Sequence, residues 1–183
     1  GKIKNIDTQL VKSMPGVFAV WTHQNVAELP PINFRPTKYK GLKPYRQPIL
    51  PDTNVRYVGE PLAVVFAENA YIAEDGANLL DIEIEELQPV VDVTDKPTRF
   101  SEDYTTEVVV IEKGYGAVEQ AFKTACHVVE LDLSIGRHSG VPLECRGCVA
   151  LVREDNGVLE LYGATKRAHP NRDLIAKTFG LNP

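Results

Sequence analysis

The sequence lacks several features that mark particular classes of protein. It contains three cysteines and one tryptophan in 183 residues, and no apolar run approaches the roughly 18 residues that a membrane-spanning helix requires. Three cysteines are too few for a disulfide scaffold and favour a reducing compartment, so we expect a cytoplasmic protein. The residues after Gly1 include charges but no apolar stretch, which argues against a secretory signal.

The charge balance excludes a further class. The chain has 20 Lys and Arg against 25 Asp and Glu, a net charge of −5. Nucleic-acid binding needs a basic face that neutralises phosphates, so we expect no nucleic-acid partner. Apolar residues make up 43% and charged residues 25%, as in ordinary globular proteins. The length suggests one domain, or one domain and part of another.

The first half of the chain has the pattern of an α/β (α+β) layer, because predicted strands and short helices follow one another. Residues 81–86 are the clearest strand, since isoleucines alternate with acids. Asn69 or Ala70 opens a helix whose small residues suit close packing on a sheet. The other predicted strands are residues 2–7, 17–21, 55–58, 62–67 and 89–93, and the other helices are residues 9–14 and 24–29.

Residues 30–53 differ from their surroundings because they contain six prolines and five basic side chains. Proline removes a backbone donor and fixes φ, so we expect a long surface loop here. Such a loop either carries solvated charges or covers a partner. A freestanding, non-catalytic protein-binding module that uses this loop is therefore one hypothesis for the chain.

The second half begins after a polar, poorly periodic stretch. We predict a domain over residues 1–95, a linker over 96–111 and a second domain over 112–183. The second domain should contain a helix at 116–125, strands at 128–135, 148–154 and 158–163, and a helix at 172–179 that Gly180 ends. Asn156-Gly157 predicts a hairpin turn between the last two strands.

Two groups of residues suggest chemistry. Cys145 and Cys148 have the C-x-x-C spacing of a redox pair or half a zinc site, and His138 is a further zinc candidate. A strand follows Cys148, so two packed thiols are the favoured interpretation. His138, Glu144 and Arg146 could converge at the end of the predicted strand 128–135. The alternative is structural: Glu144 and Arg146 would form an ion pair that holds a turn, and His138 would be an ordinary hydrogen-bond donor. The nucleotide-binding and nucleophile motifs rich in glycine are absent.

The order of several short motifs resembles one family. The motifs are Val55-Arg-Tyr-Val-Gly-Glu-Pro61, Ile84-Glu-Glu-Leu-Gln-Pro-Val90, Arg137-His-Ser-Gly-Val-Pro-Leu-Glu144, Arg146-Gly147 and Leu161-Tyr-Gly-Ala-Thr165, followed by His169 and Arg172. In this order they resemble the large, molybdenum-binding subunit of the molybdenum hydroxylases, which include xanthine dehydrogenase, aldehyde oxidase and aerobic carbon monoxide dehydrogenase. The resemblance extends over essentially the whole chain.

The resemblance implies a fold and an activity. It implies a hammerhead-type α/β domain followed by the opening, mixed-strand segment of a molybdopterin-binding domain. The family hydroxylates a carbon centre with water-derived oxygen, or oxidises CO, using molybdopterin cytosine dinucleotide with molybdenum. Its partners are iron–sulfur and FAD subunits or domains, together with the remainder of the large subunit.

The resemblance also limits what this chain holds. The family's glycine-rich loops and its general-base glutamate lie downstream, so we expect no catalytic residue and no metal ligand here. His138 stands where many members place a glutamine near the metal's oxo group, and His138, Glu144 and Arg146 are the expected cofactor-binding residues. The chain alone should be a structural and docking part that is inactive and free of cofactor.

Overall fold

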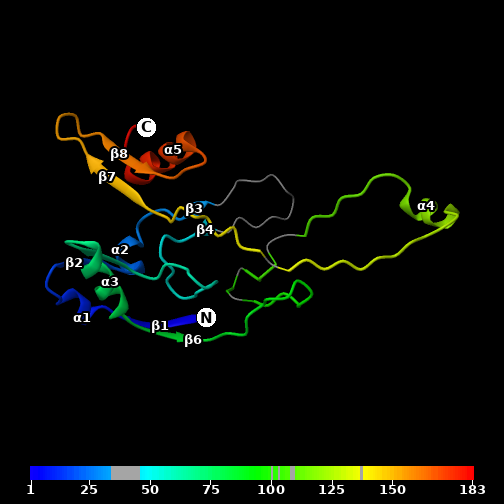
Figure 1. Ribbon diagram of the computed structural model, residues 1–183, viewed down its shortest axis with the longest axis horizontal. Coiled ribbons are helices and arrows are strands. Elements are labelled where there is room, and N and C mark those ends of the chain that lie inside the picture. Colours follow the sequence, from blue (N-terminus) through cyan, green and yellow to red (C-terminus); the bar gives the residue numbers. More distant parts are fainter. Residues whose placement is uncertain (34–45, 100, 103, 108–109, 137) are drawn as a thin grey trace. The chain divides into compact units, whose positions relative to one another are not determined.

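The computed structural model describes residues 1–33, 46–99, 101–102, 104–107, 110–136 and 138–183 (Figure 1). The chain divides into two compact units, Gly1–Lys113 and Gly114–Pro183. The domains predicted at residues 1–95 and 112–183, and the linker predicted at 96–111, are not tested by this division and stay predictions. Within the described residues, no helix is long and apolar enough to cross a membrane.

In its described residues the first unit mixes short helices with three two-stranded antiparallel sheets, which confirms the predicted class. The sheets pair β1 with β6, β2 with β5 and β3 with β4. The elements are β1 Lys2–Asp7, α1 Gln9–Lys12, β2 Val17–Trp21, α2 His23–Val26, β3 Ile32–Asn33, β4 Arg46–Gln47, β5 Val64–Ala67, α3 Ala70–Asn78 and β6 Asp81–Glu85.

The pairing of β1 with β6 combines the alternation of apolar and acidic residues in β6 with a register shift between Ile3 and Asn5 of β1. The isoleucines oppose one another in the register, Ile3 to Ile84 and Ile6 to Ile82. The charges meet as well, because the Lys4 ammonium forms an ion pair with Glu85. This contact raises the pKa of Lys4 and lowers the pKa of Glu85. The strand predicted over residues 81–86 is confirmed, one residue shorter.

The core of the first unit lies where α3 crosses the β2–β5 sheet. Val20 opposes Val65 in the register and is 2% exposed. A Cβ on Gly76 of α3 would lie 3.0 Å from Val11 Cγ1 and 3.2 Å from Val65 Cγ1, so the missing side chain permits this close approach. Asn69 begins the helix, since its Oδ1 accepts from the backbone N–H of Ile72 at 3.0 Å.

Two predicted strands of the first unit are wrong. Residues 55–58 form no strand, because Val55 bonds to Gly1 and the backbone then turns so that the Arg56 N–H reaches the Glu60 carboxylate. Residues 89–93 form none either, and the side chains of Val91 and Val93 are exposed. A strand needs a hydrogen-bonded neighbour, and β-branched residues alone do not provide one.

The ends of the proline-rich segment 30–53 meet as a very short ladder. Ile32 of β3 opposes Gln47 of β4. Most of the basic side chains that would make a contact surface, at residues 35–43, lie outside the described residues. The hypothesis of a docking loop therefore stays a prediction.

The second unit contains α4 Val118–Thr124, β7 Cys148–Val152, β8 Leu159–Gly163 and α5 Ala168–Phe179. The predicted hairpin is confirmed, with Val149 opposite Tyr162. Helix α5 begins four residues earlier than predicted, because Pro170 is tolerated in a first turn, where its missing N–H has no partner to lose. Gly180 ends the helix in the left-handed region at φ +66°, as predicted.

The strand predicted over residues 128–135 is wrong. The structure shows no regular secondary structure there, and the apolar side chains are exposed. The alternation is present in the sequence, but the described residues of this unit provide no neighbouring strand to pair with it.

Candidate functional site

The candidate site lies in the second unit and begins with the β7–β8 hairpin. At its turn Gly157 has φ +70°, and its N–H donates to the Arg153 carbonyl at 2.8 Å. Asn156 Oδ1 accepts from the Val158 N–H at 3.0 Å. The Asn-Gly pair therefore fixes the register of the two strands, because few other residues adopt this turn.

Polar contacts along the hairpin centre on Glu160. Its Oε1 lies 3.3 Å from Arg153 Nε, and its Oε2 accepts from the Tyr162 hydroxyl at 2.8 Å. The hydrogen bond to this carboxylate raises the pKa of Tyr162. These contacts orient the exposed side chains on one face of the hairpin.

An open depression lies at the opposite end of the hairpin. Its volume is about 690 Å³, and it is lined by Glu144, Cys145, Gly147, Gly163, Ala164, Thr165 and Lys166. Gly163 sits so near the preceding loop that a Cβ there would lie 2.9 Å from the Gly147 carbonyl oxygen. The pairing of Cys148 with Gly163 thus brings residues 144–147 against residues 163–166.

The entry to α5 borders this depression. Thr165 Oγ1 accepts from the Arg167 N–H at 3.3 Å and from the side-chain amide of Asn171. Lys166 therefore lies between a strand end and a helix start that are joined by a side-chain hydrogen bond. A carboxylate, a thiol, a hydroxyl and an ammonium group line one depression, which can hold a small polar ligand by hydrogen bonds and charge.

The structure separates the residues predicted to bind a cofactor. Glu144 lines the depression, whereas His138 and Arg146 do not. All three are exposed, and within the described residues no hydrogen bond or ion pair joins them. Their role stays a prediction. Sequence reasoning missed Thr165 and Lys166 as lining residues, although Gly163 at the end of a predicted strand was a signal for a close approach there.

The cysteines do not form a recognisable metal site. Cys126, Cys145 and Cys148 are free thiols and all are exposed, so the interpretation of Cys145 and Cys148 as packed thiols is wrong for the chain by itself. Within the described residues no group of three or more His, Cys, Asp and Glu side chains could hold a metal ion. The zinc hypothesis therefore gains no support.

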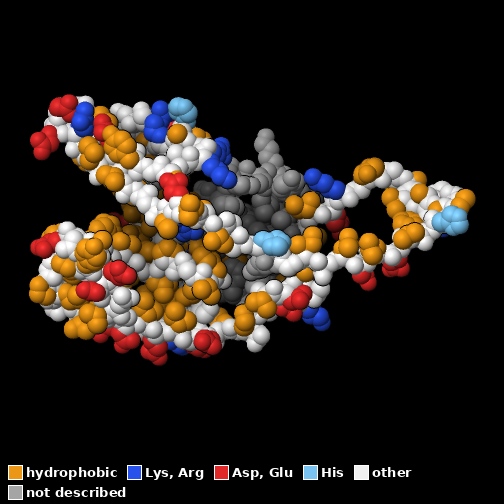
Figure 2. Space-filling view, viewed as in Figure 1, with side chains coloured by type: hydrophobic (Ala, Val, Ile, Leu, Met, Phe, Trp, Pro, Cys, Tyr) orange, Lys and Arg blue, Asp and Glu red, His pale blue; other side chains and the backbone are white. Residues whose placement is uncertain are grey.

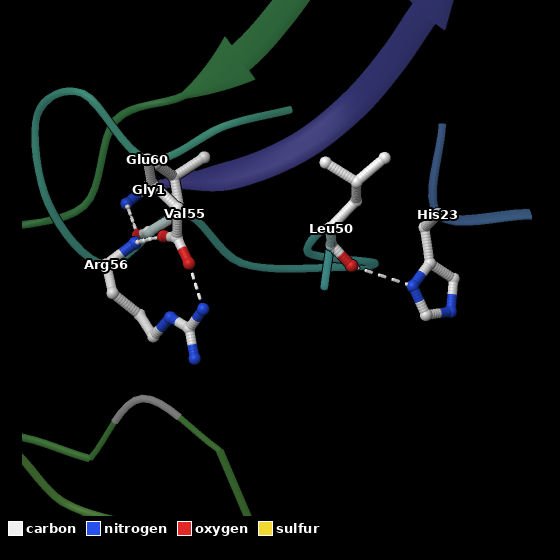
Figure 3. Close-up of polar contacts among 6 residues, drawn as sticks. All are labelled: Gly1, His23, Leu50, Val55, Arg56 and Glu60. Atoms are coloured by element: carbon white, nitrogen blue, oxygen red, sulfur yellow. Dashed lines mark hydrogen bonds and ion pairs between the residues drawn. The ribbon is translucent and has the colours of Figure 1, made fainter. Parts of the chain in front are cut away.

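A second polar cluster lies in the first unit (Figure 3). The Glu60 side chain is 1% exposed and forms an ion pair with the Arg56 guanidinium, which is 16% exposed. Its other oxygen accepts from the Arg56 N–H at 2.7 Å. Burial raises the pKa of Glu60 and lowers the pKa of Arg56.

The remaining contacts in Figure 3 show that this cluster is structural. The Gly1 ammonium donates to the Val55 carbonyl at 2.9 Å, and the Val55 N–H donates to the Gly1 carbonyl at 2.8 Å. His23 Nδ1 donates to the Leu50 carbonyl at 2.9 Å. Carboxylate, imidazole and backbone all serve to hold residues 50–60 beside β1 and α2.

Two family models match the chain in succession. One is described as the a/b hammerhead domain of aldehyde oxidase and xanthine dehydrogenase and matches residues 1–88. The other is described as a molybdopterin cofactor-binding domain and matches residues 100–183. The chain belongs to the molybdenum hydroxylase large-subunit family. The predicted hammerhead and molybdopterin-binding segments are confirmed.

Curated relatives agree with membership in this molybdenum hydroxylase family. The gamma subunit of the 6-hydroxypseudooxynicotine dehydrogenase complex of Paenarthrobacter nicotinovorans is 33% identical over 98% of this chain and 23% of its own length. The nicotine 6-hydroxylase large subunit of the same organism is 32% identical over 99% of this chain and 23% of its own length. The chain thus spans about a quarter of the length of these relatives.

A solved structure supports the fold. Quinoline 2-oxidoreductase from Pseudomonas putida 86 matches 98% of this chain and 23% of its own chain, with a TM-score of 0.86 and 30% identity. The arrangement of strands and helices described above is therefore one that molybdenum hydroxylases use.

Proposed function

We propose that this chain supplies the hammerhead domain and the start of the molybdopterin-binding domain of a molybdopterin-dependent oxidoreductase. The observation that carries the proposal is the succession of two family matches, residues 1–88 and 100–183, along nearly the whole chain. The proposed reaction is hydroxylation of a carbon centre with water-derived oxygen, or oxidation of CO. The relatives that support this are named as a dehydrogenase, a hydroxylase and an oxidoreductase.

The donor set of the second unit fits the organic part of molybdopterin cytosine dinucleotide better than it fits a metal. Lys166 and Thr165 in the depression, with Arg146 and His138 nearby in sequence, offer donors for phosphate and pterin oxygens, and Glu144 offers an acceptor for ring N–H groups. The described residues hold no cluster that could bind a metal directly. The cofactor, when bound, supplies the oxidation and reduction chemistry, and these side chains would bind and orient it.

The proposal includes partner subunits and a compartment. Relatives are named as the gamma subunit of a complex and as a large chain, so they assemble with other subunits. For this chain we propose iron–sulfur and FAD subunits, to which electrons pass. A cytoplasmic location is supported by three cysteines that are all free thiols.

A chimera tests the proposal. Residues 1–183 would replace the matching quarter of the nicotine 6-hydroxylase large subunit, with which they share 32% identity. We expect the assembled chimera to contain molybdenum by elemental analysis, whereas the 183-residue chain purified alone should contain none. A folded and assembled chimera without molybdenum would contradict the proposal, and so would stoichiometric molybdenum in the chain alone.

The three predicted cofactor residues can be tested in the same chimera. His138→Ala, Glu144→Ala and Arg146→Ala should each reduce the molybdenum content, because each removes a polar group that the cofactor would contact. Glu154→Ala is the matched control, since Glu154 is equally exposed but lies at the far end of the hairpin. Equal molybdenum content in all four variants would remove these residues from the cofactor site.

A further inference from the structure

Residues 128–135 form a segment outside the candidate site in which apolar and acidic side chains alternate. Four apolar side chains occupy alternate positions and are 91%, 74%, 81% and 84% exposed: Val129, Leu131, Leu133 and Ile135. Glu130 and Asp132 occupy the positions between them and are also exposed. In an extended chain these two sets point to opposite faces, one apolar and one acidic.

The backbone of this segment is open to a partner. Among the described residues, no strand includes 128–135 and no backbone hydrogen bond involves them. Figure 1 shows an extended trace after α4, and Figure 2 shows apolar and acidic side chains along it. Unpaired N–H and C=O groups beside exposed apolar residues make a template for another strand.

The first unit shows which kind of strand fits such a template. Strand β6 also alternates acidic and isoleucine residues, and it is paired. Its partner β1 brings isoleucines opposite the isoleucines, and Lys4 forms an ion pair with Glu85. At its Glu85 end the acidic strand β6 is thus matched by lysines of β1, since Lys2 stands opposite Glu85 and Lys4 pairs with it, whereas Asp7 stands opposite Asp81 at the other end. The lysine end agrees with the stability of opposite charges on paired strands.

A second copy of the segment fits poorly. An antiparallel pair centred on Leu131 would place Glu130 directly opposite Asp132 on both sides of the centre. Like charges directly opposite one another destabilise a strand pair. The acidic face therefore selects against self-pairing and for a strand of the opposite charge.

We propose that residues 128–135 form a strand by pairing with an extended segment in which Lys or Arg alternates with branched apolar residues. The source of that segment is the rest of the same large subunit, because this chain matches only 23% of the length of its relatives. The assignment of the pairing segment to the rest of the large subunit rests on the proposed function. The expected charge and apolar pattern of that segment does not rest on it.

Hydrogen exchange on the 183-residue chain tests the pattern. The probe is a capped peptide of alternating lysine and valine, as long as the segment, and its control alternates glutamate and valine. We expect saturating lysine–valine peptide to slow exchange of amides 128–135 by roughly tenfold, and the glutamate–valine peptide to leave it unchanged. Leu131→Ser with Leu133→Ser should abolish the protection. No protection, or equal protection by both peptides, overturns the proposal.

Charge reversal distinguishes strand pairing at residues 128–135 from attraction of a basic peptide to the net negative charge of the chain. Glu130→Lys with Asp132→Lys should invert the preference, so that the glutamate–valine peptide protects the segment. Glu154→Lys with Asp155→Lys changes the net charge equally at the exposed hairpin turn and should keep the preference for lysine. If the preference between the two peptides inverts in both double variants, or in neither of them, the proposal is contradicted.

The source of the strand is tested in the intact large subunit of nicotine 6-hydroxylase. The stretch aligned with residues 128–135 should exchange slowly when this subunit is purified without its partner subunits and without molybdenum. Protection that develops only after the partner subunits are added would contradict the assignment of the pairing strand to the large subunit itself. Because the measurement does not depend on the cofactor, its failure is distinct from failure of the molybdenum test.

Discussion

The two units differ in how far they bury their own apolar side chains. Among the described residues, Val11, Val20, Val26 and Leu50 are buried in the first unit, whereas only Ala176 is buried in the second. The first unit closes a small core between α3 and the β2–β5 sheet, and its acidic strand β6 is paired with β1, whose Lys4 forms an ion pair with Glu85. The described residues of the second unit form a hairpin, two helices and an acidic segment that has no partner strand. The same type of sequence therefore becomes a strand or stays open according to its partner.

The largest effect should come from removing the buried carboxylate of the first unit. Glu60→Ala leaves the Arg56 guanidinium without its ion pair in a buried position. We expect a loss of about 3 kcal/mol in the free energy of unfolding, because breaking a buried ion pair strands a charge. Urea titration followed by fluorescence of the single tryptophan, Trp21 in β2, measures this unit directly.

Glu154→Ala in the second unit is the control for this change, since its carboxylate is exposed. It should shift the Trp21 transition by less than about 0.5 kcal/mol. If both variants unfold alike, the contacts of Glu60 contribute no more to stability than an ordinary surface carboxylate.

The next effect concerns the core itself. Val20→Ala should lower the free energy of unfolding by about 2 kcal/mol, because it leaves a cavity beneath α3. Phe18→Ala, on the same strand but 71% exposed, should cost less than about 0.5 kcal/mol. Thermal or urea unfolding of the two variants gives the comparison, and a larger loss from Phe18 would place the core on the other face of the sheet.

The outcome of the sequence predictions follows the same division. Features fixed by neighbouring residues were predicted, such as the helix start at Asn69 or Ala70, the Asn156-Gly157 turn and the Gly180 end of α5. Strands at 55–58, 89–93 and 128–135 were wrong, because a strand also needs a partner that local sequence does not specify. Residues 55–58 show the competition directly, since the Glu60 carboxylate takes the Arg56 N–H.

The candidate site was predictable to a similar extent. Glu144 could be named from its motif, and it does line the depression. Thr165 and Lys166 line it only because β7 pairs with β8 in one register, which brings two distant loops together. Spacing along the chain carries no information on that proximity until the register is known.

A matched pair of serine substitutions sharpens the contrast between the two acidic segments. Ile82→Ser in β6 removes a half-buried side chain that opposes Ile6, and should cost about 1 kcal/mol. Leu131→Ser removes a side chain that is 74% exposed, and should change the stability of the chain by less than about 0.5 kcal/mol. Unfolding followed by hydrogen exchange reports both units, and equal costs would mean that residue 131 is buried in solution.

The smallest effect is the pH dependence of the β1–β6 ion pair. The contact lowers the pKa of Glu85 below its usual 4.5, so the folded chain binds this proton more weakly than the unfolded chain does. Its contribution is therefore fully present above that value and is lost as the pH falls through the lowered pKa. The raised pKa of Lys4 acts in the opposite direction, since its contribution is present below 10.5 and is lost as the pH rises through the folded value.

Glu85→Gln should consequently lower the melting temperature slightly near neutral pH and have no effect below the lowered pKa. High salt should also remove the difference, because both side chains are exposed. Glu83→Gln on the same strand is the matched control, because no ion pair of Glu83 is found among the described residues. A difference between Glu85→Gln and the unmodified chain that persists in acid and in salt would show that packing of the Lys4 and Glu85 stems, rather than their charge, joins β1 to β6.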